Sequence, residues 1–168
     1  EDPQARSSLV NGLVALSTVQ CALGRADLAE KVNREALKLR PNSPIILNNL
    51  AWALCLDPEA SIYDPARAAE LARKAIAATS DGKPSDRSTF YNTLGMALIR
   101  AGDWRGADEA LKTSMEMNGN TVPHDWFLAA IVREKLGDRA RALELYRKAL
   151  DAMKAWRDPE LSRLRDEA

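Results

Sequence analysis

The chain has 168 residues, of which 46% are hydrophobic and 29% are charged. This composition is typical of a folded globular domain and excludes a disordered or fibrous chain. Lysine plus arginine and aspartate plus glutamate both number 24, so the basic stripe that nucleic-acid binding requires is not expected. The sequence has 28 alanines but only 12 valines and isoleucines, a balance that favours closely packed helices over sheets.

Cysteine and histidine are too scarce for two common kinds of site. The two cysteines cannot form a disulfide framework, so nothing in the sequence indicates secretion, and one histidine excludes a histidine-rich metal site. No apolar run is long enough to span a membrane or to act as a signal peptide. We therefore expect a cytoplasmic protein with no metal and no cofactor. The chain begins with Glu1-Asp2-Pro3 and not with methionine, and we expect it to be cut from a longer protein.

Prolines and glycines divide the chain into helical stretches. Pro44, Pro65 and Pro159 each follow a serine or an aspartate, a pattern typical of a capping residue and the first residue of a helix. Glycine ends apolar-periodic runs at three other points, as it does at helix C-termini. No segment alternates with period two, so no strand is predicted. The predicted helices lie near residues 8–22, 26–39, 44–56, 65–79, 86–100, 104–117, 123–136, 139–156 and 159–166.

The helices come in pairs, and the pairs repeat. Gly24, Gly102 and Gly137 each stand five residues before an alanine of the following helix. With a fourth alanine in the 65–79 helix, these small residues recur at spacings of 39, 39 and 35 residues. A period in this range indicates stacked helix pairs, in which small residues let antiparallel helices approach closely. The alanines are Ala29, Ala68, Ala107 and Ala142.

The pattern resembles the tetratricopeptide repeat (TPR). The third unit carries it most completely, from Phe90 through the small-residue pair Leu94-Gly95 to the turn Gly102-Asp103-Trp104. The resemblance covers about residues 9–153. It implies a single all-α domain, a right-handed superhelical solenoid of about four helix pairs. The predicted units are 9–41, 44–79, 86–118 and 123–153, followed by a short capping helix at 158–166 with Leu161 and Leu164 inward.

The second unit departs from this pattern, because it carries an inserted loop at residues 57–63. This loop and several neighbouring segments also resemble the repeat arrays of large bacterial multidomain signalling proteins. In those proteins the array often lies downstream of a serine/threonine kinase module. This resemblance implies a role in bacterial signalling. The kinase motifs themselves are absent from this sequence. The segments that carry the resemblance are Asn48 to Ala53, the loop, Asp64-Pro65-Ala66 and Tyr91 to Gly95.

No arrangement of residues indicates catalysis. His124 is the only histidine and lies beside Asp125, but the repeat places no serine or cysteine near it, so we predict that the protein is not an enzyme. Cys21 and Cys55 occupy equivalent places on the first helices of consecutive units. Stacked helices lie about 8–10 Å apart, whereas a disulfide needs Cα atoms closer than about 7 Å, so both cysteines are predicted to be free thiols.

The candidate ligand-binding site is the inner groove, because in TPR proteins the first helix of each pair lines that groove. Asparagine is a poor helix former, so asparagines on matching helices suggest that their side chains hydrogen-bond to another group. Trp52, Phe127 and Ile131 have an alternative interpretation, in which they pack between units. The lysines with which some TPR proteins clamp a peptide carboxylate are missing. The predicted groove residues are Asn48, Asn49, Trp52, Asn92, Met96, Ile99, Arg100, His124, Phe127 and Ile131.

We expect a non-catalytic scaffold that binds a protein segment with apolar anchors in this groove. The alternative is an oligomerisation or spacer module within a larger, kinase-type signalling protein. Apolar residues cover more than one side of the first helix, whereas a terminal repeat should present a polar outer face. We therefore expect an upstream repeat, or a second copy of this chain, to cover that helix, and we expect neither nucleic acid nor a membrane as a partner. The apolar residues are Leu9, Val10, Leu13, Val14, Leu16, Val19 and Leu23.

Overall fold

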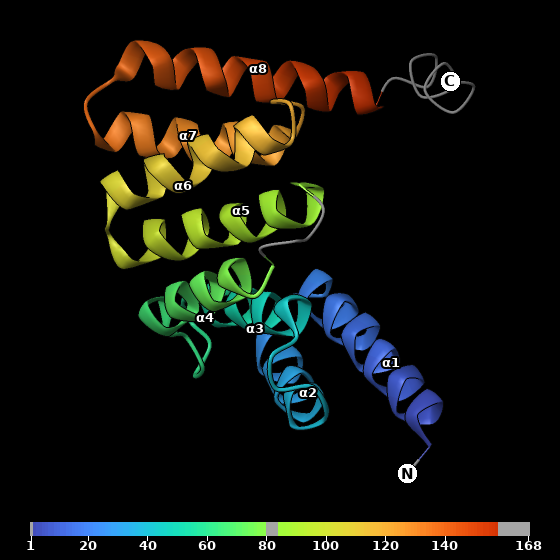
Figure 1. The fold of residues 1–168 in the computed structure, drawn as a ribbon. Coiled ribbons are helices and arrows are strands. Elements are labelled where there is room, and N and C mark those ends of the chain that lie inside the picture. The colour runs from blue at the N-terminus through green and yellow to red at the C-terminus, as the bar shows by residue number, and fades with distance from the viewer. Residues whose placement is uncertain (1, 80–83, 158–168) are drawn as a thin grey trace.

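The computed structural model describes residues 2–79 and 84–157. These residues form eight α-helices and no strand, which confirms the predicted all-α solenoid. The helices stack in pairs, with the N-terminus at one end of the stack and the last helix at the other (Figure 1). They are α1 (Pro3–Ala22), α2 (Ala26–Leu39), α3 (Pro44–Leu56), α4 (Pro65–Ala77), α5 (Pro84–Ala101), α6 (Trp104–Met117), α7 (Pro123–Lys135) and α8 (Arg139–Arg157).

The first helix is longer than the sequence pattern predicted. It begins at Pro3, five residues before the predicted start at residue 8, because the Asp2 side chain accepts a hydrogen bond from the Gln4 amide and caps the helix. Asp64 caps α4 as predicted, by accepting a hydrogen bond from the Arg67 amide. Ser43 precedes α3 but makes no such side-chain bond. The predicted capping helix at 158–166 lies outside the described residues.

The turn glycines end helices as the sequence predicted. Gly24, Gly102 and Gly137 have φ angles of 70°, 80° and 86°, a left-handed conformation that side chains with a Cβ rarely adopt. After α1, the Arg25 amide donates to the Gln20 carbonyl, which closes the helix end. Each glycine therefore turns the chain sharply into the second helix of its pair.

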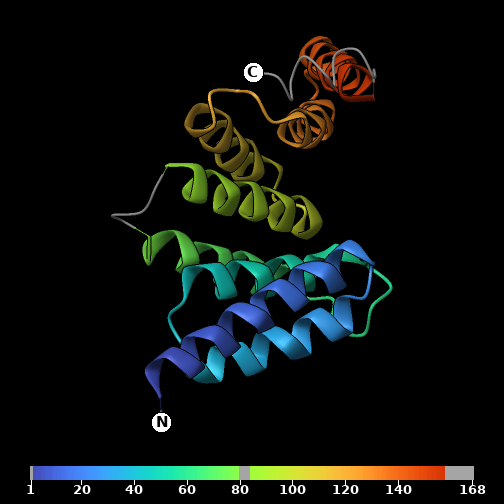
Figure 2. The ribbon, with the colours of Figure 1, turned by 90° about the vertical axis from the view of Figure 1, so that its right-hand side faces the viewer.

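The first helices of the pairs form one side of the stack. α1 contacts α3, α3 contacts α5 and α5 contacts α7, whereas within the described residues no contact joins α2 to α4, α4 to α6 or α6 to α8. Seen from the side, successive helices form a zigzag (Figure 2). Helices on the inside of a curved stack lie closer together than those on the outside, so α1, α3, α5 and α7 line the concave face.

Small residues sit where the helices of a pair approach most closely. The four alanines that define the repeat are buried, and a Cβ added to Gly95 on α5 would lie 2.7 Å from the Leu111 Cγ on α6. The main hydrophobic core runs without interruption from α3 to α8. A separate cluster of only three buried residues, Val10, Ala36 and Ile46, joins α1 and α2 to α3. The first helix pair is therefore attached through a much smaller core than the other three.

Candidate functional site

The predicted groove residues fall into three groups in the structure. One group forms a pocket between α1 and α3, a second forms a junction between α3, α5 and α7, and a third lines a pocket between α7 and α8. Of the four remaining residues, Asn48 is buried, Met96 and Ile99 are half-buried, and Arg100 is exposed.

The pocket between α1 and α3 lies on the concave face. It has a volume of about 330 Å³, and two of the predicted groove residues, Asn49 and Trp52, supply its α3 wall. Both side chains are partly exposed, so the pocket offers an aromatic ring and an amide to a ligand. Its remaining lining comes from Thr18, Cys21 and Ala22 of α1 and from Leu56 of α3. We call it the α1–α3 pocket.

The junction brings together residues from three inner helices. The Trp52 and His124 rings lie with their centroids 5.9 Å apart, tilted by 59°. The Asn92 Nδ2 lies 3.2 Å from the His124 Nδ1, to which it donates when that nitrogen is unprotonated. The sequence placed these three residues on one face, and the structure joins them across three repeats.

Asn92 has a second partner that the sequence analysis missed. Its amide also donates to Asp125, whose carboxylate is fully buried in the first turn of α7 and accepts from Ser114 Oγ at 2.8 Å and Asn118 Nδ2 at 2.7 Å. Three donors and the helix N-terminus stabilise this negative charge. The Asn92 amide nitrogen therefore already has partners within the chain, and its role in ligand binding stays a prediction. The sequence could have predicted this partner, because Asp125 stands two residues after Pro123, in the first turn of the helix that packs against α5.

Asn48, Met96 and Ile99 are enclosed to different degrees. Asn48 is 6% exposed, and its Oδ1 has no hydrogen-bond partner. Met96 and Ile99 are half-buried and pack against the main core. Arg100 is exposed at the end of α5. Its charge weakly opposes the effect of burial on the pKa of the Cys55 thiol of α3.

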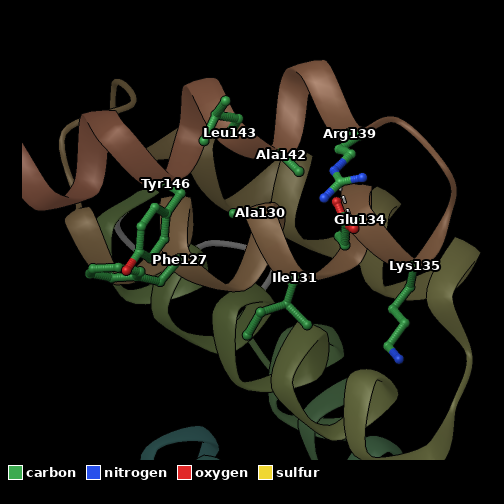
Figure 3. Close-up of a pocket in the computed structure, with 9 residues that line it drawn as sticks. All are labelled: Phe127, Ala130, Ile131, Glu134, Lys135, Arg139, Ala142, Leu143 and Tyr146. Carbon is green, nitrogen blue, oxygen red and sulfur yellow. Dashed lines mark ion pairs between the residues drawn. The ribbon is translucent and has the colours of Figure 1, made fainter.

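Phe127 and Ile131 line a separate and larger pocket between α7 and α8. It has a volume of about 610 Å³, and the Phe127 ring meets the Tyr146 ring edge-on at 5.7 Å. Figure 3 shows these two rings at one end of the pocket and the Glu134–Arg139 ion pair at the other. The floor between them is formed by Ala130 and Ala142.

Burial favours the neutral forms of the two cysteines and of His124. Burial raises the pKa of the Cys55 thiol to about 12, against a weaker opposing effect of Arg100. Burial also raises the pKa of Cys21, and both cysteines are free. Loss of water around the ring lowers the pKa of His124, which the Asp125 charge partly opposes. A nucleophile needs an accessible thiolate, so neither cysteine is poised for catalysis.

Two negative findings apply to the part of the chain that the structure describes. It contains no group of three or more histidine, cysteine, aspartate or glutamate side chains that could hold a metal ion. None of its helices combines the length and apolarity needed to cross a membrane.

Comparison with known proteins identifies the fold. The Sgt2 TPR domain from Aspergillus fumigatus is 24% identical, with a TM-score of 0.65 over 83% of each chain. PilF of Pseudomonas aeruginosa is 20% identical, with a TM-score of 0.71 over 94% of this chain and 66% of its own. MamA of Desulfovibrio magneticus is 19% identical, with a TM-score of 0.66 over 87% and 76%. The sequence matches no protein-family model and no curated protein. The chain therefore has the fold of the TPR-containing proteins.

Proposed function

We propose that this chain is a non-catalytic scaffold that binds a segment of another protein on its concave face. The α1–α3 pocket carries the proposal. It combines the partly exposed Trp52 ring and the apolar Leu56 with the Asn49 amide, within a volume of about 330 Å³. Such a combination suits one large apolar anchor of a peptide and one hydrogen bond to its backbone.

The electrostatics of this surface favour an apolar ligand. The chain has a formal net charge of zero, and Arg100 is the one charged residue among the ten predicted for the groove. Burial of apolar area is little affected by salt, whereas attraction between exposed charges is screened. Binding in the α1–α3 pocket is therefore expected to depend weakly on ionic strength.

The proposal includes a cellular setting. The resemblance to repeat arrays of large bacterial signalling proteins supports a role as one module of such a protein. Many of the proteins that carry these arrays also contain a serine/threonine kinase module. The free thiols Cys21 and Cys55 support a reducing, cytoplasmic location. The alternative function, an oligomerisation or spacer module in such a protein, is favoured by the exposed apolar residues of α1.

A peptide selection tests the binding proposal. Random peptides displayed on phage are selected on the unmodified chain, and the affinity of a selected peptide is measured by fluorescence anisotropy. Trp52→Ala is expected to weaken binding about 30-fold, because truncation of a buried aromatic anchor costs about 2 kcal/mol. Asn49→Ala is expected to weaken it about fivefold, the value of one hydrogen bond.

Two controls make the result decisive. Leu28→Ala removes an exposed leucine from α2, away from the concave face, and should leave affinity unchanged. Thermal unfolding of each variant shows whether it is folded at the assay temperature, and Trp52→Leu replaces Trp52→Ala if the latter is not. Peptides that bind equally to all variants would refute the pocket assignment. A steep loss of affinity between low and moderate salt would refute the claim about the ligand.

A further inference from the structure

The exposed apolar side of α1 is a repeat-stacking surface without a repeat on it. Val19 stands two residues after Ser17, the small residue of the first unit, and is 53% exposed. Leu9, Leu16 and Leu23 are also exposed and lie on the same side as Val19, because all four residues are spaced at helical intervals. The residues that correspond to Val19 in the later units are no more than 1% exposed, because they pack against the preceding pair: Ala53, Ala97 and Val132. We call this side of α1 the leading face.

The pocket between α7 and α8 is the opposite end of the same stacking pattern. Tyr146 stands four residues after the repeat alanine Ala142 and is 47% exposed, as is its neighbour Leu143. Its counterparts lie on α2, α4 and α6, each of which contacts the first helix of the next pair, and they are no more than 1% exposed: Asn33, Ala72 and Leu111. We call this surface the trailing face (Figure 3).

We propose that the leading face of one copy of this chain docks into the trailing face of another, so that copies associate head to tail. The contact would continue the interface that α3, α5 and α7 already make within the chain. The two faces lie at opposite ends of the stack (Figure 1), so one copy can use both at once. A contact between two different faces does not close on itself as a twofold dimer does.

Charge favours this occupant. Residues 7–24 of α1 and its turn contain no lysine, arginine, aspartate or glutamate, so the helix brings no charge to an apolar pocket. Of the charged residues that line the trailing face, Glu134 pairs with Arg139, and Lys135 lies over the Trp104 ring.

Two single variants test the proposal without disturbing the core. Val19→Lys places a charge on the leading face and Leu143→Lys places one on the trailing face, both at exposed positions. Leu28→Lys, on α2, is the matched control. Molar mass is measured by sedimentation velocity over a concentration series, with circular dichroism to confirm equal helix content. The unmodified chain and Leu28→Lys are expected to rise above the 18.5 kDa monomer and to pass the mass of a dimer.

Mixing the variants distinguishes a head-to-tail contact from other arrangements. Val19→Lys alone and Leu143→Lys alone should both stay monomeric, because each has one intact face and no complement. Their equimolar mixture should form a dimer of one copy of each and nothing larger. A dimer of Leu143→Lys alone would overturn the proposal in favour of pairing between two α1 helices. An unmodified chain that stays monomeric at every concentration, or a mixture that stays monomeric, would also overturn it.

Discussion

The contact between α5 and α6 at Gly95 gives a prediction in which the same substitution has opposite effects at two sites. Replacing glycine by alanine inside a helix gains about 1 kcal/mol of stability, because alanine loses less backbone entropy on folding. At Gly12 on α1 an added Cβ meets no atom within 4 Å, so Gly12→Ala should stabilise the protein by about 0.5–1 kcal/mol.

At Gly95 the gain is offset by a clash. The added Cβ would lie 2.7 Å from both Cγ and Cδ2 of Leu111, about 1 Å closer than carbon atoms pack, and Leu111 is buried with little room to move. Overpacking of this kind costs about 1–3 kcal/mol. Gly95→Ala should therefore be less stable than Gly12→Ala by about that amount, and destabilised by about 1 kcal/mol overall.

Urea unfolding followed by circular dichroism at low protein concentration measures both effects. Leu111→Ala alone should cost about 2–5 kcal/mol. In the Leu111→Ala background the clash is gone, so Gly95→Ala should become stabilising, as Gly12→Ala is. If Gly95→Ala stabilises the unmodified chain as much as Gly12→Ala does, close approach of α5 and α6 is not the reason for glycine at this position.

Three further outcomes are expected. Asp125→Asn should destabilise the fold by about 1.5–3 kcal/mol in urea unfolding, because one of its three hydrogen-bond donors then faces an NH₂ group. Asp108→Asn is the control: it breaks the more exposed ion pair with Arg133 and should cost about 1 kcal/mol or less. Thiol titration of the unreduced, denatured protein should count two free thiols. In the native protein Cys21 should react before Cys55, because burial keeps Cys55 protonated with a pKa of about 12. A count of zero without a covalent dimer would contradict the stacking of α1 on α3. The pKa of His124 in the folded protein lies below its unfolded value, so the stability that His124 contributes is complete above pH 6.5 and is lost as pH falls from 6.5 through the lowered pKa. The His124→Gln variant should not show this loss when its unfolding is measured across the same pH range. Identical pH profiles for the two proteins would contradict the shift.

The fold was predictable from sequence because its determinants are local. The turn glycines and the small residues that let helices pair recur in register, and each acts within its own unit, as Gly95 does against Leu111. The length of α1 was underestimated because the capping role of Asp2 was not used. These features need no knowledge of how one pair is rotated against the next.

The candidate site was only partly predictable, because it depends on that rotation. Asn48 and Asn92 stand at matching places in consecutive units, yet one is buried without a partner for its Oδ1 and the other binds Asp125 of the following unit. Phe127 was assigned to the groove by register alone, and the structure pairs it with Tyr146 of α8. A residue's position within its repeat does not say which side chain of the next repeat lies opposite.

The small core that holds the first helix pair has a thermodynamic consequence for ligand binding. The α1–α3 pocket has one wall on α1 and the other on α3, across the interface whose buried cluster is Val10, Ala36 and Ile46, with Leu13, Val14, Leu37 and Leu39 packed around it. If that pair detaches, the pocket is lost while the main core from α3 to α8 persists. A bound segment would contact both α1 and α3 and would stabilise the attachment of the first helix pair. By linkage, a variant that weakens this attachment should also lower the affinity of the pocket for its ligand. Amide hydrogen exchange in α1 and α2 would then report occupancy directly, with the slowest amides of α5 and α6 unchanged.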